Sequence, residues 1–339
     1  MLGLMQRHPL LLSSIIAHAA RHHAAAEVVS VRLDGTVHRT DYAGVERRAR
    51  RVLTLLRDGL GVRPGDRVAT LAWNGYRHLE LYYGISGLGA VCHTVNPRLS
   101  PDDIAYIMGH AEDGVVFAEL SFLALLDEVV PRVPSLKHVV LLCEPGELPS
   151  LDLPAGVVLH AHEALMDAAA EAPAWPVFDE NTASALCYTS GTTGRPKGVL
   201  YSHRSAMLHS YAANMADGFG FRARDRILVG PSMFHACAWG IPYCAPMVGA
   251  AMILPGRHMD GASLTRLMHE ERATFAGGVP TVWLGVLQHM QETGARPPET
   301  LKRLLVAGSA CPRVLIEGFA PWGVDVHQGW GMTETSPLV

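Results

Sequence analysis

Residues 188–199 read YTSGTTGRPKGV and follow an apolar run at residues 184–188 that is typical of a β-strand. The stretch contains four aliphatic hydroxyls, three glycines and a lysine. Glycines let backbone N–H groups approach an anion, hydroxyls donate to phosphate oxygens, and Lys197 adds a point charge. A Walker A loop is excluded, because Pro196 and Gly198 stand where that motif needs Gly and Ser or Thr. The pattern predicts a loop that binds polyphosphate; the alternative is a flexible surface turn.

Strand-like runs alternate with helical patterns on both sides of this loop. Residues 28–40 are typical of a hairpin around Asp34-Gly35, and residues 100–103 (SPDD) combine a cap, a proline and acidic residues, as helix starts do. The alternation predicts α/β architecture with mainly parallel sheets flanked by helices. The further expected strands are residues 67–72, 91–95, 114–118, 138–142, 226–229, 250–254, 303–307 and 324–328.

A break in this alternation suggests two lobes. Residues 171–181 (EAPAWPVFDEN) are rich in proline and polar residues, which favours a crossing segment. We therefore expect a first α/β lobe at residues 1–175 and a second at residues 176–339, with the phosphate loop in the second.

Composition excludes several function classes. The 339 residues are 49% hydrophobic and 18% charged, with a net charge of −4, so no nucleic-acid surface is expected. The basic residues at 47–51 are spaced as expected for the solvent-exposed face of a helix. Six cysteines without a CxxC pair indicate free thiols in a reducing compartment, and hence a cytoplasmic protein. The 18 histidines show no metal-ligand spacing.

Two apolar segments could be mistaken for membrane signals. Residues 10–16, followed by Ala17-His18-Ala19, could be a signal peptide, but their spacing also fits an amphipathic helix, which we favour. Residues 236–256 carry no charge but contain three prolines, so we expect a buried helix and a strand there. No transmembrane segment is expected.

Two later stretches follow the loop as further motifs of the same set, in the same order and at the same spacing. They are residues 306–312 (VAGSACP) and residues 328–334 (QGWGMTE). All three together resemble the motifs of the adenylate-forming superfamily, which comprises acyl-CoA synthetases, peptide-synthetase adenylation domains and firefly-type luciferases. The resemblance covers the whole chain, and it implies the large amino-terminal domain of such an enzyme. The implied co-substrates are ATP and coenzyme A, with Mg²⁺.

The resemblance also implies roles for individual residues. Thr189 and Glu334 would lie by Mg²⁺, and Trp330 replaces the tyrosine usual in the third motif, so any hydrogen bond of that tyrosine is lost. A hydroxyl and a hard carboxylate do suit Mg²⁺, which also takes phosphate and water ligands. The expected catalytic residues are Thr189, Lys197, His235 and Glu334. The expected nucleotide-binding residues are Ser190, Gly191, Thr192, Thr193, Gly194, Gly308, Ser309, Ala310, Gln328, Gly329, Trp330 and Thr333.

Residues 231–240 (PSMFHACAWG) resemble the acyl-binding region of bacterial fatty acyl-CoA synthetases, in which a tryptophan gates the fatty-acid tunnel. Trp239 would be that gate, or it is plain core packing. His235 contacts the substrate carboxylate or is a satisfied core histidine. No acidic residue lies between Ser232 and Leu254, and a buried substrate ammonium without a partner would be costly. A fatty acid is therefore expected; a short thioether, branched or aromatic acid is the alternative.

The chain stops five residues after Glu334. Members of the superfamily continue with a ribose-binding aspartate and a small mobile lid domain that carries a catalytic lysine. We therefore expect a fragment without this lid domain, or else a nucleotide-binding remnant without full catalysis. A homodimer is expected by analogy with similar bacterial enzymes.

Overall fold

The computed structural model describes residues 1, 3–172, 174–189 and 194–337, and contains two seven-stranded sheets flanked by helices. The α/β architecture expected from the sequence is thereby confirmed. Among the described residues, no helix is both long and apolar enough to cross a membrane.

Sheet 1 is built mostly from the first half of the chain. Its strand order is β7-β6-β5-β3-β4-β8-β9, and all neighbours are parallel except β8 and β9. The strands are β3 (Arg67–Leu71), β4 (Val91–Thr94), β5 (Val115–Ala118), β6 (His138–Leu141), β7 (Val158–Ala161), β8 (Ala183–Thr189) and β9 (Lys197–Ser202).

Sheet 2 repeats the same plan. Its order is β14-β13-β12-β10-β11-β1-β2, again with one antiparallel edge pair, β1 and β2. The strands are β1 (Glu27–Val31), β2 (Val37–Asp41), β10 (Arg226–Val229), β11 (Ala251–Leu254), β12 (Phe275–Gly278), β13 (Arg303–Val306) and β14 (Asp325–Gln328). Each sheet has a switch point in its parallel part, between β3 and β5 in sheet 1 and between β10 and β12 in sheet 2. Such switch points open crevices at the carboxyl ends of parallel strands.

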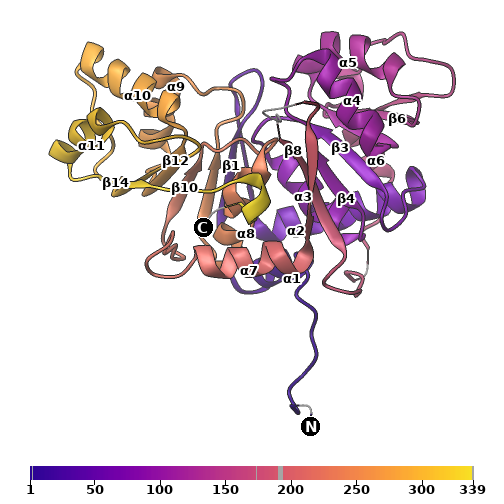
Figure 1. The fold of residues 1–339 in the computed structure, drawn as a ribbon, viewed down its shortest axis with the longest axis horizontal. Helices are drawn as coiled ribbons and strands as arrows, with labels where there is room; N and C mark the ends of the chain where they lie inside the picture. Colours follow the sequence, from indigo (N-terminus) through magenta and orange to yellow (C-terminus); the bar gives the residue numbers. More distant parts are fainter. Residues whose placement is uncertain (2, 173, 190–193, 338–339) are drawn as a thin grey trace.

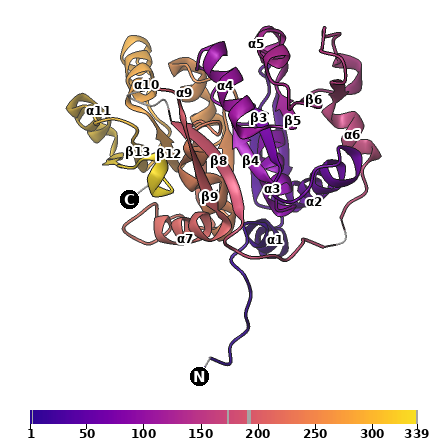
Figure 2. The same ribbon diagram turned by 45° about the vertical axis from the view of Figure 1, so that its right-hand side comes forward.

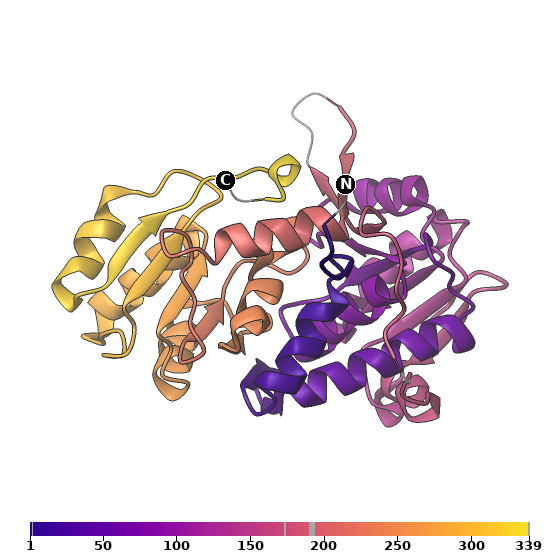
Figure 3. The same cartoon turned by 90° about the horizontal axis from the view of Figure 1, so that it is seen from below.

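Three helical layers enclose the two sheets. The apolar core between the sheets includes residues from α1, α2, α3, α7 and α8, while α4 and α5 pack on the outer face of sheet 1 and α9, α10 and α11 on that of sheet 2 (Figure 1). Seen from below, α7 runs across the junction of the two sheets (Figure 3). The helices are α1 (Ser13–His22), α2 (Tyr42–Thr54), α3 (Tyr76–Gly87), α4 (Pro101–Ala111), α5 (Leu123–Val129), α6 (His162–Ala168), α7 (His203–Ala213), α8 (Ile241–Val248), α9 (Gly261–Glu270), α10 (Pro280–Thr293) and α11 (Arg313–Phe319).

The sheets do not divide at the expected crossing segment. The hairpin β1–β2 pairs with β11 in sheet 2, and β8–β9, from beyond residue 176, completes sheet 1 next to β4. Each half of the chain thus contributes one antiparallel strand pair to the sheet that is formed mainly by the other half. The local pattern of a strand does not reveal this exchange, because it specifies which face is buried and not which neighbour pairs with it.

Candidate active site

The ends of the phosphate loop are fixed by the antiparallel pair β8–β9, whose strands stand side by side in Figure 2. Thr189, at the end of β8, pairs directly with Lys197, at the start of β9. The loop therefore leaves and re-enters sheet 1 at a single point, and Lys197 is exposed there. Gly194 has a φ of +140°, which favours glycine. The predicted residues Ser190, Gly191, Thr192 and Thr193 lie outside the described residues.

Helix α4 holds both ends of this loop, through contacts that the sequence did not suggest. The Tyr188 hydroxyl and Nδ1 of His110 share a hydrogen bond of 2.7 Å. The guanidinium of Arg195 stacks over the Tyr106 ring, with its carbon 4.7 Å from the ring centroid. Tyr188 also contacts His93, which is buried beside the central strands. The loop is thus anchored to a rigid element on either side.

The two later motifs lie side by side because β13 and β14 are parallel neighbours. The backbone N–H of Gly329 donates to the carbonyl of Val306 at 2.9 Å, and that of Cys311 donates to Oε1 of Gln328 at 3.2 Å. The predicted residues Ser309 and Ala310 are exposed in the loop between. Trp330 is 57% exposed, so its ring is free to cover a ligand.

Gly308 belongs to residues 306–312, the predicted adenine-side loop, and lies next to residues 231–240, the predicted acyl-binding region, which we call the acyl-side segment. Its φ of +86° favours glycine, and a Cβ placed on it would lie 3.1 Å from Cγ1 of Val279 and 3.9 Å from the Trp239 ring. A larger residue would therefore press on Val279 and come into ordinary van der Waals contact with Trp239. The structure thus brings Trp239 next to the predicted adenine-side loop.

Glu334 lies on a short 3₁₀ turn, Thr333–Thr335, and is exposed. The neighbouring Thr333 is buried, and its carbonyl accepts a hydrogen bond from the Tyr201 hydroxyl on β9. The pKa of Tyr201 is raised, foremost by burial and then by Cys187, Cys237 and the Glu334 carboxylate. The third motif is therefore attached to the strand that begins with Lys197.

The donor set at this place has one exposed carboxylate, the hydroxyl-bearing Thr189 and the lysine of β9. Within the described ranges, no group of three or more His, Cys, Asp and Glu side chains is placed to hold a metal ion. A site with one carboxylate and one hydroxyl fits Mg²⁺ when phosphate and water oxygens complete the shell.

Trp239 ends an unusual turn that follows β10. Ala236, Cys237, Ala238 and Trp239 all have φ between +40° and +57°. Each non-glycine residue in this region costs roughly 1–2 kcal/mol, so the turn is strained. Trp239 is only 7% exposed. The expected buried helix and strand, α8 and β11, follow, but this left-handed turn was not anticipated, because none of its first four residues is glycine.

His235, just before the turn, is exposed. Partial desolvation, followed by the nearby Arg98 guanidinium, lowers its pKa. Arg98 itself stacks over the Phe234 ring at 5.6 Å. The lowered pKa favours the neutral ring, which can donate one hydrogen bond and accept another. It is not the satisfied core histidine that the sequence left open.

The acyl-side segment is held in place by residues that sequence reasoning missed. Nδ2 of the buried Asn74 donates to the carbonyls of Val229 and Pro231 at 2.7 and 2.8 Å, and its Oδ1 accepts from the N–H of Met233 at 2.7 Å. Tyr82 donates to the carbonyl of Met233 as well. No local pattern signals such contacts, since about 150 residues separate the partners.

A small cavity of about 10 Å³ lies beside the turn. This volume is close to the minimum that one water molecule needs. Its lining includes Cys237, Gly240 and Tyr243 from the acyl side, Tyr201 from β9, and Ser336-Pro337 from the end of the chain, and it contains no Asp, Glu, Lys or Arg. The cavity is therefore too small to hold an acyl chain without movement of the residues around it.

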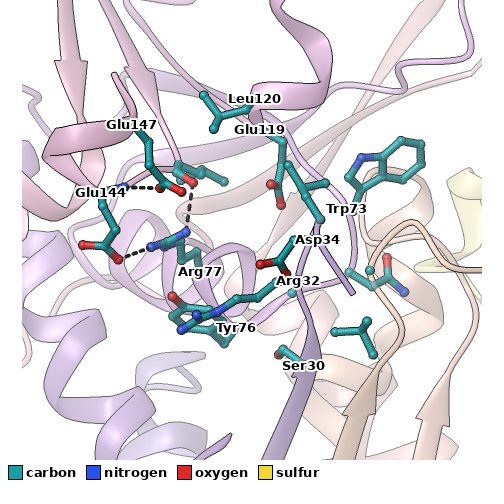
Figure 4. A pocket seen from close by; sticks show the side chains of 16 residues that line it. Ser30, Arg32, Asp34, Trp73, Tyr76, Arg77, Glu119, Leu120, Glu144 and Glu147 are labelled. Carbon is teal, nitrogen blue, oxygen red and sulfur yellow. Dashed lines mark hydrogen bonds and ion pairs between the residues drawn. The ribbon is translucent and has the colours of Figure 1, made fainter. Parts of the chain in front are cut away.

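A larger cavity, of about 170 Å³, lies at the switch point of sheet 1 (Figure 4). Trp73 and Asn74 follow β3 there, and Glu119 follows β5. Burial raises the pKa of Glu119 to about 7. None of the predicted site residues lines this cavity. The cavity is connected to the candidate site through two of its lining residues. Asn74 is hydrogen-bonded to the acyl-side segment, and Trp73 contacts Phe234 of that segment.

Comparison with known proteins identifies the family to which the chain belongs. The family model described as AMP-binding enzyme matches residues 16–339. The chain is 48% identical over all 339 residues to a 3-methylmercaptopropionyl-CoA ligase of Ruegeria lacuscaerulensis, and equally to a medium-chain-fatty-acid–CoA ligase of Ectopseudomonas oleovorans. It spans 62% and 61% of the lengths of these relatives.

Solved structures show the same fold. A crystal structure of the anthranilate CoA ligase AuaEII in complex with anthranoyl-AMP matches 97% of the chain with a TM-score of 0.85, at 23% identity. The chain covers 62% of that structure.

Proposed function

We propose that this chain, which belongs to the AMP-binding enzyme family, forms the nucleotide- and acyl-binding part of an AMP-forming acid–coenzyme A ligase. In the first step the substrate carboxylate attacks the α-phosphorus of ATP, which releases pyrophosphate and leaves an acyl-adenylate. In the second, the thiol of coenzyme A attacks the acyl carbon and AMP leaves.

The observation that carries this proposal is the short distance between Gly308 and the ring of Trp239. The adenine-side loop and the acyl-side turn belong to different motifs, 69 positions apart, and yet a Cβ on Gly308 would touch the Trp239 ring. A carboxylate at the end of an acyl chain beside Trp239 would therefore meet the nucleotide at this point. Adenylate formation needs this proximity above all, because the reaction requires positioning and no nucleophilic side chain.

We assign the polar residues to the handling of charge. The Thr189 hydroxyl and the Glu334 carboxylate would hold Mg²⁺, which neutralises phosphate charge when it is bound. Lys197 stabilises the phosphate oxygens, together with the loop that includes Ser190 to Thr193 and Gly194. Gly308, Ser309, Ala310, Gln328, Gly329 and Trp330 surround the adenosine, and Thr333 positions Glu334. Neutral His235 donates a hydrogen bond to the substrate carboxylate.

We further propose a fatty acid as substrate. The cavity beside the turn has no ionisable carboxylate to pair with an ammonium group, which disfavours amino acids. The buried Trp239 occupies the room that an acyl chain would need, and the strained turn can release it. A short thioether acid is the second candidate, because the equally similar Ruegeria relative is named for one and because the resting cavity is small.

The test is ATP–pyrophosphate exchange by the full-length protein with a panel of acids. Butyrate, octanoate, decanoate, 3-(methylthio)propionate and leucine cover the alternatives. For a fatty-acid ligase, kcat/KM rises with chain length, because each buried CH₂ contributes about 0.8 kcal/mol until the tunnel is full. A maximum at the thioether would select the second candidate, and a preference for leucine would exclude both.

A further inference from the structure

Two thiols meet where β8, which leads into the phosphate loop, passes the left-handed turn. Cys187 lies on β8, two residues before Thr189, and Cys237 lies in the left-handed turn, two residues before Trp239. Their sulfurs are 3.5 Å apart. Both side chains are buried, with exposures of 1% and 3%. A disulfide requires about 2.05 Å, so the sulfurs need to approach by about 1.5 Å.

From this juxtaposition we propose that Cys187 and Cys237 are a site of oxidative modification, at which hydrogen peroxide forms a reversible disulfide that locks the acyl-side turn. The bond itself does not depend on the proposed function, whereas its effect on catalysis rests on that function.

The surroundings make the two thiols unequal. The Thr94 hydroxyl oxygen lies 3.3 Å from the Cys187 sulfur. The Thr94 hydroxyl can donate a hydrogen bond to the Cys187 sulfur and so stabilise a thiolate, the reactive form of cysteine. We therefore take Cys187 as the attacking residue and Cys237 as the resolving one.

The chemistry is balanced with peroxide as the oxidant. The Cys187 thiolate attacks one peroxide oxygen; the O–O bond breaks, an S–O bond forms, and hydroxide leaves and takes up a proton. The Cys237 thiol then attacks the sulfenic sulfur, the S–S bond forms, and the S–O bond breaks with release of water. Two electrons pass from the two sulfurs to peroxide, and the sum is two thiols plus H₂O₂ to one disulfide plus two waters.

The fold determines which partner moves. Cys187 lies in a strand between β4 and β9 and is held by hydrogen bonds on both sides. Cys237 belongs to a strained turn and also lines the small cavity beside Ser336-Pro337. The bond would therefore draw the turn onto β8. Because an acyl chain needs the turn to open, the disulfide would exclude the acid while leaving the nucleotide loop in place.

The bond is tested by mass spectrometry of the full-length protein. The protein is oxidised with hydrogen peroxide, its remaining thiols are alkylated under denaturing conditions, and it is digested with chymotrypsin. Phe178 separates Cys143 from Cys187, and Trp239 separates Cys237 from Cys244, so the linked peptides are unique. We expect a Cys187–Cys237 peptide pair two hydrogens lighter than its parts, removed by dithiothreitol, absent from Cys187→Ser and Cys237→Ser, and retained in the control Cys244→Ser. Free alkylation of both cysteines after peroxide, or a link from Cys187 to Cys92, would overturn the proposal.

The effect on catalysis is measured separately. In oxidised wild-type protein we expect decanoate-dependent ATP–pyrophosphate exchange to fall at least tenfold and to recover with dithiothreitol, while ATP binding by calorimetry changes less than twofold. Cys237→Ser should keep its exchange rate in peroxide. A formed link with unchanged exchange would refute the locking of the turn. If even the reduced wild type shows no exchange with any acid, the proposed function fails, and the linked peptide still decides the modification.

Discussion

The hydroxyl of Tyr201 donates a hydrogen bond to the carbonyl oxygen of Thr333, 132 positions further along the chain. Tyr201 is on β9, which begins with Lys197, and Thr333 precedes Glu334. This hydrogen bond links the strand that follows the phosphate loop to the turn that carries the proposed metal ligand.

Tyr201→Phe should therefore displace Glu334. The buried carbonyl of Thr333 loses its donor, which costs about 1–3 kcal/mol and favours movement of the turn. We expect roughly tenfold slower ATP–pyrophosphate exchange and a higher Mg²⁺ requirement. The exposed Tyr211 on α7 offers a matched control, and Tyr211→Phe should leave both quantities unchanged. Equal Mg²⁺ titrations for Tyr201→Phe and wild type would contradict this role.

Glu334→Gln should slow the exchange at least 100-fold, which corresponds to about 3 kcal/mol of lost transition-state stabilisation. The amide keeps the shape of the side chain but removes the charge that Mg²⁺ needs. Because Glu334 is exposed, thermal unfolding should stay within about one degree of wild type. Glu317→Gln, at an exposed residue of α11, is the control. A wild-type rate in Glu334→Gln would remove the metal assignment.

Two tryptophan variants should separate acid binding from nucleotide binding. Trp239→Ala opens room beside the turn, so the preferred acid should become longer while the KM for ATP changes less than twofold. Trp330→Ala removes an exposed ring on the adenosine side, so it should raise the KM for ATP and leave the acid profile unchanged. The measurement is kcat/KM across saturated acids and ATP. The reverse pattern would show that the two rings are misassigned.

The cavity in Figure 4 makes stability depend on pH. Burial raises the pKa of Glu119 to about 7, so the folded state binds this proton more tightly than the unfolded chain does. The resulting stabilisation is fully present below the ordinary pKa of glutamate and is lost as the pH rises through about 7. Urea unfolding of wild type should therefore lose up to about 3 kcal/mol between pH 5 and 8 relative to Glu119→Gln. The exposed Glu128→Gln should follow wild type.

The sequence by itself determined the features that depend on residues close together in the chain. The predicted phosphate-binding character of residues 188–199 rests on a contiguous string of glycines, hydroxyls and a lysine, and most strands and helix starts follow from local periodicity and caps. The predicted cap at Ser100 is present, with its side chain accepting from the N–H of Asp103. The two later motifs were recognised in the same way. The strands β7 and β12 were missed, because each has only four residues and lacks a clear alternating pattern, and β9 was missed, because its first residues belong to the stretch interpreted as the phosphate loop.

Only the tertiary structure decided how these pieces meet. The exchange of hairpins between the sheets, the anchoring of the acyl-side segment by Asn74, and the contact of Gly308 with Trp239 all join segments far apart in the chain. The left-handed turn and the close approach of Cys187 and Cys237 are of the same kind. A strained backbone persists only where surrounding packing enforces it, and that packing is a property of the whole fold and not of residues 236–239.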